Sequence, residues 1–259
     1  MLFDLRGKRK RVVQVSYVLL ALLFVVGFLG FGIGVGGGPG GIFDALGIGN
    51  GSSNPGTSQF QDNVDAAQAK LAKNPNDTKA LLKLAENEYL IGKTGVTQDQ
   101  STGQISISND AHTDFGQAAD AWSKYLKVNK GKPDTSVAAE MVYVYAFLND
   151  AAGAIEAQRI VAENEPNSNT YGTLAQFQYL SGDIAAGDET SKKAVSLASG
   201  AQKKAIQKQL DQLRKQGLQV QKQQKQAKKA AGGASTTPGT NPLEAPFGGA
   251  AGAPTPTSP

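Results

Sequence analysis

The stretch SVAAEMVYVYAFLNDAAGAIEAQRIVAENEP, from Ser136 to Pro166, predicts a complete pair of antiparallel helices. Asn149 and Asp150 supply a polar turn between two segments of helical periodicity, and Pro166 cannot continue a helix. In the first segment the apolar side chains recur on one helical face, at Ala138, Met141, Val142, Tyr145 and Leu148. A single hairpin cannot bury both of its faces, so we expect copies of it on either side.

Compact residues repeat at one spacing in two successive units. Twelve and then seven residues separate the members of each set, which are Val142, Ala154 and Val161 in one unit and Ala175, Gly187 and Ala194 in the next. The period between Ala154 and Gly187 is 33 residues. A further unit is indicated upstream by Leu84, Ala85 and Gly92 for its first helix and by Phe115, Ala118, Trp122 and Tyr125 for its second.

On these residues the chain from about Gln59 to Gly217 resembles a tetratricopeptide-repeat (TPR) array, a family with a period of about 34 residues. The resemblance implies an all-α fold, an α-solenoid of about three helix pairs over residues 58–217 with partial helices at both ends. An insertion at 93–114 interrupts the first pair. The sequence departs from the family pattern at Ala138 and Tyr171, where tryptophan is frequent, and at Tyr125, where alanine is usual.

Local signals place the elements around this hairpin. Residues 60–73 are expected to form a helix that Asn74-Pro75 ends, and Asp77 or Thr78 is expected to cap a helix over 79–91. Within the insertion, the alternation in residues 104–108 predicts a small hairpin with Val96-Thr97. Residues 201–229 keep a sparse apolar stripe that caps the array, and we expect the helix to fray beyond Gly217.

Residues 12–33, VVQVSYVLLALLFVVGFLGFGI, contain no charged residue over 22 positions. A helix of this length spans roughly 33 Å, which matches the hydrocarbon core of a bilayer. We therefore predict a transmembrane helix, with a basic head at residues 1–11 in the cytoplasm and the C-terminal bulk outside. A cleaved signal peptide and a buried core helix are the alternatives; the long apolar run and its lack of a polar face argue against them.

Segments of different composition flank the predicted repeats. Residues 34–57 are rich in glycine and predict a flexible linker. Residues 218–259 begin as a Lys/Gln-rich helix end and continue as a Pro/Ala/Gly/Thr tail, which we expect to be disordered. Residues 34–199 hold 12 basic and 19 acidic residues, a net of −7, whereas residues 200–231 hold nine basic residues and one acidic residue. The whole-chain charge of +4 thus conceals an acidic domain, which argues against nucleic-acid binding.

Residues that carry catalysis are scarce in this sequence. The absence of cysteine excludes disulfides, thiolate catalysis and cysteine-ligated zinc, and the only histidine, His112, has no partner ligands grouped near it. Asp99, Asp110 and Asp114 lack the spacing of a calcium-binding loop, and no phosphate-binding glycine run occurs. We therefore predict a protein that is not an enzyme, with no catalytic residue, cofactor, metal or small-molecule substrate.

The TPR resemblance implies that a peptide or helix of another protein binds along the concave face formed by the first helix of each pair. Carrying over the family's inward-facing positions gives a candidate groove of Leu82, Glu86, Tyr89, Ala139, Tyr143, Ala146, Gln176 and Tyr179. This set has three tyrosines, one acid and no Lys or Arg, so the implied ligand is apolar or mildly basic. The alternative is that these tyrosines pack rather than recognise a partner.

Together these features predict a single-pass membrane protein of a bacterial-type cell whose helical repeats form an extracytoplasmic protein-binding scaffold. The layout also resembles that of ancillary factors beside the protein-secretion channel, which implies a role in the secretion or folding of exported proteins. The alternatives are a structural envelope tether or self-associating spacer, and an enzyme with an unrecognised site. The partner and the oligomeric state are open at this point.

Overall fold

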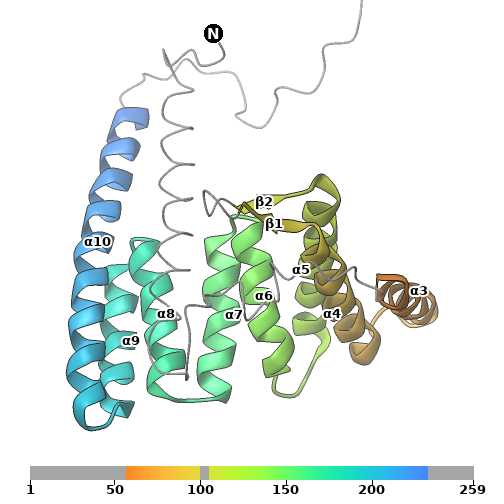
Figure 1. Ribbon diagram of the computed structural model, residues 1–259, viewed down its shortest axis with the longest axis horizontal. Helices are drawn as coiled ribbons and strands as arrows, with labels where there is room; N and C mark the ends of the chain where they lie inside the picture. Colours follow the sequence, from red (N-terminus) through yellow and green to blue (C-terminus); the bar gives the residue numbers. More distant parts are fainter. Residues whose placement is uncertain (1–56, 100–104, 233–259) are drawn as a thin grey trace, which may run out of the picture. The chain divides into compact units, whose positions relative to one another are not determined.

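The computed structural model describes residues 57–99 and 105–232, with side chains to residue 226. These residues form eight α-helices and one two-stranded antiparallel sheet (Figure 1). The elements are α3 (Thr57–Lys73), α4 (Thr78–Thr94), β1 (Val96–Gln98), β2 (Ile105–Ile107), α5 (Asn109–Val128), α6 (Thr135–Phe147), α7 (Ala151–Asn164), α8 (Ser168–Leu180), α9 (Ile184–Leu197) and α10 (Gly200–Gly232). The basic head, the predicted transmembrane helix, almost all of the linker and the C-terminal tail lie outside the described residues.

Helices that follow one another in the chain pack together in pairs. Three pairs, α4–α5, α6–α7 and α8–α9, form the body of the domain; α3 precedes them and packs on α4, and α10 follows them (Figure 1). The first helices α4 and α6 of successive pairs also contact each other directly. An all-α domain of packed helix pairs is thus confirmed for the described part of the chain.

The first pair is joined by the predicted hairpin rather than by a short turn. Its register pairs Val96 with Ile107 and Gln98 with Ile105. Helices α4 and α5 extend into the expected insertion at 93–114 from both sides, since α4 ends at Thr94 and α5 begins after Ser108. The Ser108 Oγ accepts the backbone N–H of Ala111 at 3.1 Å, and this N-cap is the local reason why α5 begins there.

The turns inside the second and third pairs repeat with a period of 33 residues. Asn149 has a φ of 58° and Gly182 a φ of 85°, so both occupy the left-handed region. After each of them an aspartate N–H bonds back to the preceding helix, from Asp150 to the Tyr145 carbonyl at 2.8 Å and from Asp183 to the Gln178 carbonyl at 2.9 Å. This is the bond that closes a Schellman-type helix end.

Each of these two aspartates also starts the next helix. The Asp150 Oδ1 accepts the N–H of Gly153 at 2.9 Å, and the Asp183 Oδ1 accepts the N–H of Ala186 at 3.1 Å. One aspartate therefore ends one helix and caps the next, and this leaves only a short reversal between antiparallel partners. The sequence hairpin at 136–166 is confirmed, and its turn chemistry recurs in the following pair.

Close helix contacts inside the pairs depend on glycine. A Cβ placed on Gly153 would lie 2.4 Å from the Tyr145 ring, and one on Gly187 would lie 2.5 Å from the Tyr179 ring. In the first pair the roles are reversed, because Gly92 of the first helix lies against Phe115 of the second. An aromatic ring thus packs on the bare backbone of the facing helix in all three pairs.

The long helix α10 packs on the last pair through one face. Ile206, Leu210 and Leu213 are buried with residues of α8 and α9, and Gly217 approaches the Tyr179 carbonyl so closely that a Cβ would lie 2.4 Å from it. Beyond Gly217, where the sequence predicted fraying, the helix continues to Gly232. Gln221 Nε2 donates to the Gly182 carbonyl at 3.3 Å and extends the contact past Gly217.

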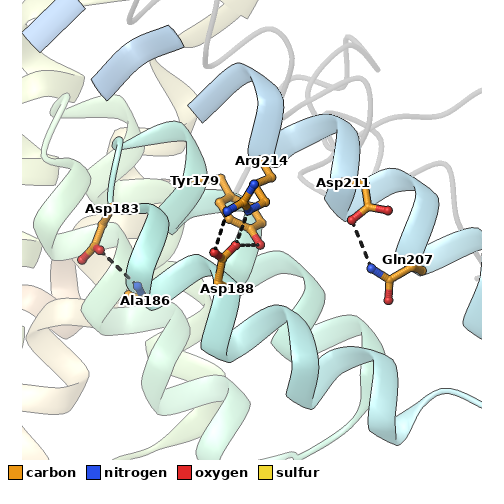
Figure 2. Close-up of polar contacts among 7 residues, drawn as sticks. All are labelled: Tyr179, Asp183, Ala186, Asp188, Gln207, Asp211 and Arg214. Carbon is orange, nitrogen blue, oxygen red and sulfur yellow. Dashed lines mark hydrogen bonds and ion pairs between the residues drawn. The ribbon is translucent and has the colours of Figure 1, made fainter. Parts of the chain in front are cut away.

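A polar contact joins α10 to α8 and α9 (Figure 2). Asp188 on α9 accepts from the Arg214 guanidinium on α10 and, at 2.8 Å, from the Tyr179 hydroxyl on α8. Asp183 and Ala186, drawn in the same view, form the cap that begins α9. The last helix pair is therefore covered by a helix that is fixed by both apolar and charged groups.

Candidate functional site

Most of the sequence-predicted groove residues lie on the two first helices that touch each other. Helix α4 carries Leu82, Glu86 and Tyr89, and α6 carries Ala139, Tyr143 and Ala146. Leu82, Ala139 and Tyr143 are partly buried against the first core cluster, and Tyr89 is inside it with 4% of its surface exposed. The structure thus brings this part of the predicted set together where α4 meets α6.

Glu140 is the feature that sets this surface apart. It is the only charged residue of α6, it is half-buried, and its Oε2 is buried with no hydrogen-bond partner among the described residues. Burial in the first place, and then the nearby carboxylates of Glu86 and Asp134, raise its pKa from the ordinary 4.5 to about 7. Lys93 and Lys83 of α4 act in the opposite direction. Glu140 therefore has unused acceptor capacity beside a second carboxylate.

Glu86 provides that second carboxylate from the facing helix. Its Oε2 accepts from Lys83 Nζ at 2.6 Å in an ion pair one turn apart on α4. About a third of the Glu86 side chain is exposed, at 32%, so the group is accessible from solvent. The two acids reach the same region from α4 and α6, with one of them paired and the other unpaired.

Two tyrosines border these carboxylates. Burial raises the pKa of Tyr89, and the neighbouring Glu140 and Tyr143 raise it further. Burial alone raises the pKa of Tyr143, which is half-buried and therefore retains an accessible edge. We name Glu86, Tyr89, Glu140 and Tyr143 the α4–α6 acidic patch. The patch combines the accessible edge of Tyr143 with two carboxylates, while the ring of Tyr89 lies beneath them in the core.

The predicted groove residues on α8 lie elsewhere. Gln176 is 3% exposed and Tyr179 is 2% exposed, so neither side chain lines an open surface. Tyr179 packs on Gly187, and burial together with its hydrogen bond to Asp188 raises its pKa to about 12. The Tyr179 ring is therefore a packing residue between α8 and α9, which is the alternative to partner recognition that the sequence left open.

Helix α8 nevertheless carries two further buried amide atoms without partners. Within the described residues, Gln176 Nε2 and Gln178 Oε1 make no hydrogen bond. With Glu140 Oε2, all three such atoms belong to first helices of pairs. Of the three, the Glu140 atom belongs to a half-buried residue on the α4–α6 surface, whereas Gln176 is enclosed by the protein.

Glu88 on α4 and His112 on α5 are two further titratable residues of the described helices. Glu88 is buried, and burial raises its pKa to about 7 with a further contribution from Asp114. His112 lies exposed in the first turn of α5. No group of three or more His, Cys, Asp or Glu residues able to hold a metal occurs in the described part of the chain.

Sequence reasoning missed Glu140 although it selected its neighbours. The family pattern chose Ala139 and Tyr143 on α6 and passed over the acid between them. A signal was present, because Glu140 is a lone charge in the apolar segment SVAAEMVYVYAF. Charge isolation within a helix predicts a buried or functional group, but only the contact of α4 with α6 shows which neighbours it meets.

Comparisons with known proteins return no matching family model and no similar curated protein. Across residues 57–99 and 105–232, none of the helices has the length and apolar character needed to cross a membrane.

Proposed function

We propose that this protein is a non-catalytic TPR-type scaffold whose α4–α6 acidic patch binds a protein segment with a basic side chain. The observation that carries the proposal is the buried, unpartnered Oε2 of Glu140 beside Glu86. A lysine or arginine of a partner would supply the missing donor and neutralise two neighbouring carboxylates. Tyr143 would pack against the aliphatic part of that side chain or against its cation.

The repeat geometry supports the choice of a scaffold. Three helix pairs, the 33-residue recurrence of the aspartate turns and the contact between first helices are typical of an α-solenoid. In such arrays the first helices form the binding face, and the unpaired Glu140 Oε2 on α6 fits an inner face that hydrogen-bonds an extended segment. The TPR family is part of this proposal.

The cellular setting belongs to the same proposal and depends on the sequence. Residues 12–33 would anchor the chain in a membrane, with the N-terminus in the cytoplasm and the repeats outside it. A scaffold so placed fits an ancillary role in the secretion or folding of exported proteins. A structural tether or self-associating spacer remains the second candidate, and the experiment below separates the two.

Site-directed photo-crosslinking in membranes of the native host tests the proposal. The probe replaces Tyr143 on the α4–α6 acidic patch or, as a control, Lys124, which is exposed on the second helix α5. Gln158 is unsuitable as a control because it is buried and donates to the Thr170 carbonyl at 3.0 Å. We expect adducts with other proteins at position 143 and none at position 124.

Two carboxylate variants make the result specific. In the probe-bearing chain, Glu140→Gln is expected to lower the adduct yield about tenfold, because a charge-assisted bond is lost. Glu189→Gln removes an exposed acid from α9 and should leave the yield unchanged. Equal labelling at 143 and 124, or an unaffected yield in Glu140→Gln, would refute the binding patch; adducts only with a second copy of the chain would favour the spacer.

A further inference from the structure

Helix α10 has a second, outward face that the packing of the domain does not use. Its buried residues Ile206, Leu210, Leu213 and Gly217 follow one another at intervals of four, three and four, so they share one side of the helix. A residue two positions after a buried one lies about 200° around the helix axis. Lys208 follows Ile206 and Lys215 follows Leu213 in this way, and both are exposed.

These lysines belong to a regular row. Lys204, Lys208, Lys215 and Lys222 are separated by four, seven and seven residues, close to whole numbers of helical turns. All four are exposed, and none makes an ion pair with any described residue. We name them the α10 lysine row. Over 18 residues it extends about 27 Å along a single line on the helix.

The row keeps a net positive charge although one acid lies on the same line of the helix. That acid is Asp211, the one carboxylate in α10, which is four residues before Lys215 and accepts a hydrogen bond from Gln207 Nε2 at 3.1 Å (Figure 2). The remaining cation on this part of the helix, Arg214, is occupied by Asp188. Residues 34–199 carry a net charge of −7, so the positive charge collects on the terminal helix of an otherwise acidic chain.

We propose that the α10 lysine row is a docking surface for a bilayer that contains anionic lipids. A straight row of equally oriented ammonium groups fits a plane of phosphate head groups, each lysine near such a surface contributing about fivefold to partitioning. Lysine is a compact, hydrated point charge without the bidentate fork of arginine, which suits a diffuse anionic surface better than a defined carboxylate pair.

The residues between the lysines support a lipid surface over nucleic acid. Gln212 and Gln219 are exposed there, and the outward face has no aromatic residue on which a base could stack. In α10 up to residue 226 no large apolar side chain is exposed for insertion, so the contact is electrostatic and stays at the head groups. If residues 12–33 span a membrane, a flexible chain of the 23 residues before Thr57 would give a root-mean-square separation of about 25 Å between the membrane and the start of the domain.

Head-group proximity measured on the full chain tests this docking. The sequence has no cysteine, so Gln219→Cys provides a single labelling position between Lys215 and Lys222, and Gln68→Cys on the exposed surface of α3 provides its control. The labelled chain is combined with lipid nanodiscs of phosphatidylcholine alone or with 30% phosphatidylglycerol, as roughly one anionic lipid in three. A nitroxide on the lipid head group quenches the fluorophore at short range.

We expect quenching at position 219 to be at least threefold stronger in anionic discs than in neutral discs, and to return to the neutral level at about 0.5 M salt. A variant with all four row lysines changed to glutamine should show the neutral level in both discs. Changing four other exposed lysines, Lys73, Lys79, Lys124 and Lys127, alters net charge equally and should leave the effect intact. Circular dichroism verifies that both variants stay helical.

Three results would overturn the proposal. Equal quenching in neutral and anionic discs would mean that binding of the α10 lysine row does not depend on lipid charge. A full effect in the variant without the row would place the contact elsewhere. The fluorophore emission at position 219 can also be compared after addition of duplex DNA or of anionic discs at the same salt. A larger change in emission with DNA would identify nucleic acid as the partner. Because the comparison is between lipid compositions, it holds whether or not residues 12–33 are inserted.

Discussion

Asp188 on α9 accepts two hydrogen bonds from Arg214 on α10, from Nε to Oδ1 at 2.7 Å and from Nη2 to Oδ2 at 3.1 Å. The same Oδ1 accepts from the Tyr179 hydroxyl of α8. One carboxylate therefore connects three helices and joins α10 to residues 26 positions earlier in the chain (Figure 2). The arginine and aspartate side chains are 45% and 33% exposed, so we expect the pair to position α10 more than to stabilise the whole domain.

Arg214→Gln should accelerate hydrogen exchange of α10 amides while leaving those of α4 and α6 unchanged. The hydrogen bonds from Arg214 hold the pKa of Asp188 below its usual range, and a depressed folded pKa contributes stability above the unfolded pKa. In the unsubstituted chain this contribution is lost as the pH falls below about 4. Exchange mass spectrometry at pH 7 checks the effect. Arg159→Gln, which breaks pairs confined to α7, is the matched control.

Glu140→Gln should remove a pH dependence of folding stability. The folded pKa of about 7 lies above the ordinary 4.5, so the neutral carboxyl is favoured in the folded state, and the unsubstituted chain loses stability as the pH rises from about 4.5 through 7. We expect the variant to be more stable by on the order of 2 kcal/mol at pH 8 and equally stable at pH 4. Urea unfolding of the full chain in detergent, followed by the buried single Trp122, measures this.

The control for that series is Glu189→Gln, which removes an exposed acid from α9. It should unfold like the unsubstituted chain at both pH values. A Glu140→Gln variant that is destabilised at pH 8 would show that the carboxylate is stabilised by interactions absent from the structure, and it would count against the description of Glu140 as an unpaired buried acid.

Substitutions at the two left-handed turn positions should change the free energy of unfolding differently: alanine in place of glycine should lower it, and glycine in place of asparagine should not. Gly182→Ala places a Cβ at a φ of 85° and should destabilise the domain by about 1–2 kcal/mol. Asn149→Gly relieves a φ of 58° at the equivalent position and should be neutral or slightly stabilising. Chemical denaturation compares the two. Equal effects at both positions would mean that the turns are not equivalent in energy.

Gly217→Ala should loosen α10, because its Cβ would lie 2.4 Å from the Tyr179 carbonyl and 2.8 Å from the Ile184 side chain. Backbone cannot move aside as a flexible side chain can, so we expect a loss of about 1–3 kcal/mol. Gly172→Ala is the control: it lies in α8 with nothing within 4 Å of its Cβ, and it should stabilise by about 0.5–1 kcal/mol through helix propensity. Thermal unfolding that ranks the two in the reverse order would contradict this packing.

Local chemistry made much of the helical domain predictable. Asp77 caps α4 as expected, the hairpin turn at Asn149 and Asp150 is correct, and Val96 pairs with a residue of the alternating segment, Ile107. These features depend on neighbours close in sequence. The ends of α4 and α5 were less predictable, because both continue into a segment whose polar composition favours a loop. Helix α10 extends past Gly217, where the sequence predicted fraying, and its contacts with α8 and with the turn before α9 are made by Gly217 and Gln221.

For the candidate surface, the sequence predicted the helical face of each residue but not how deeply that residue is buried. Glu86 and Tyr143 could be selected from the register of the repeats, and they lie where the first helices meet. Tyr179 follows the same register, yet its ring is enclosed by the facing glycine and its hydroxyl is held by Asp188. A register states which face a residue belongs to, but it does not state how deeply the neighbouring helix covers that face.

The sequence by itself determined the helices, their pairing and the turns between them, because periodicity, caps and left-handed residues act within a few positions along the chain. Only the tertiary structure decided that Glu140 is left with an unpartnered oxygen between α4 and α6, and that Arg214 reaches Asp188 across 26 residues. Whether a charged side chain is buried, and which partner it meets, depends on which helices pack against each other. The order of residues along the chain does not state those distances in space.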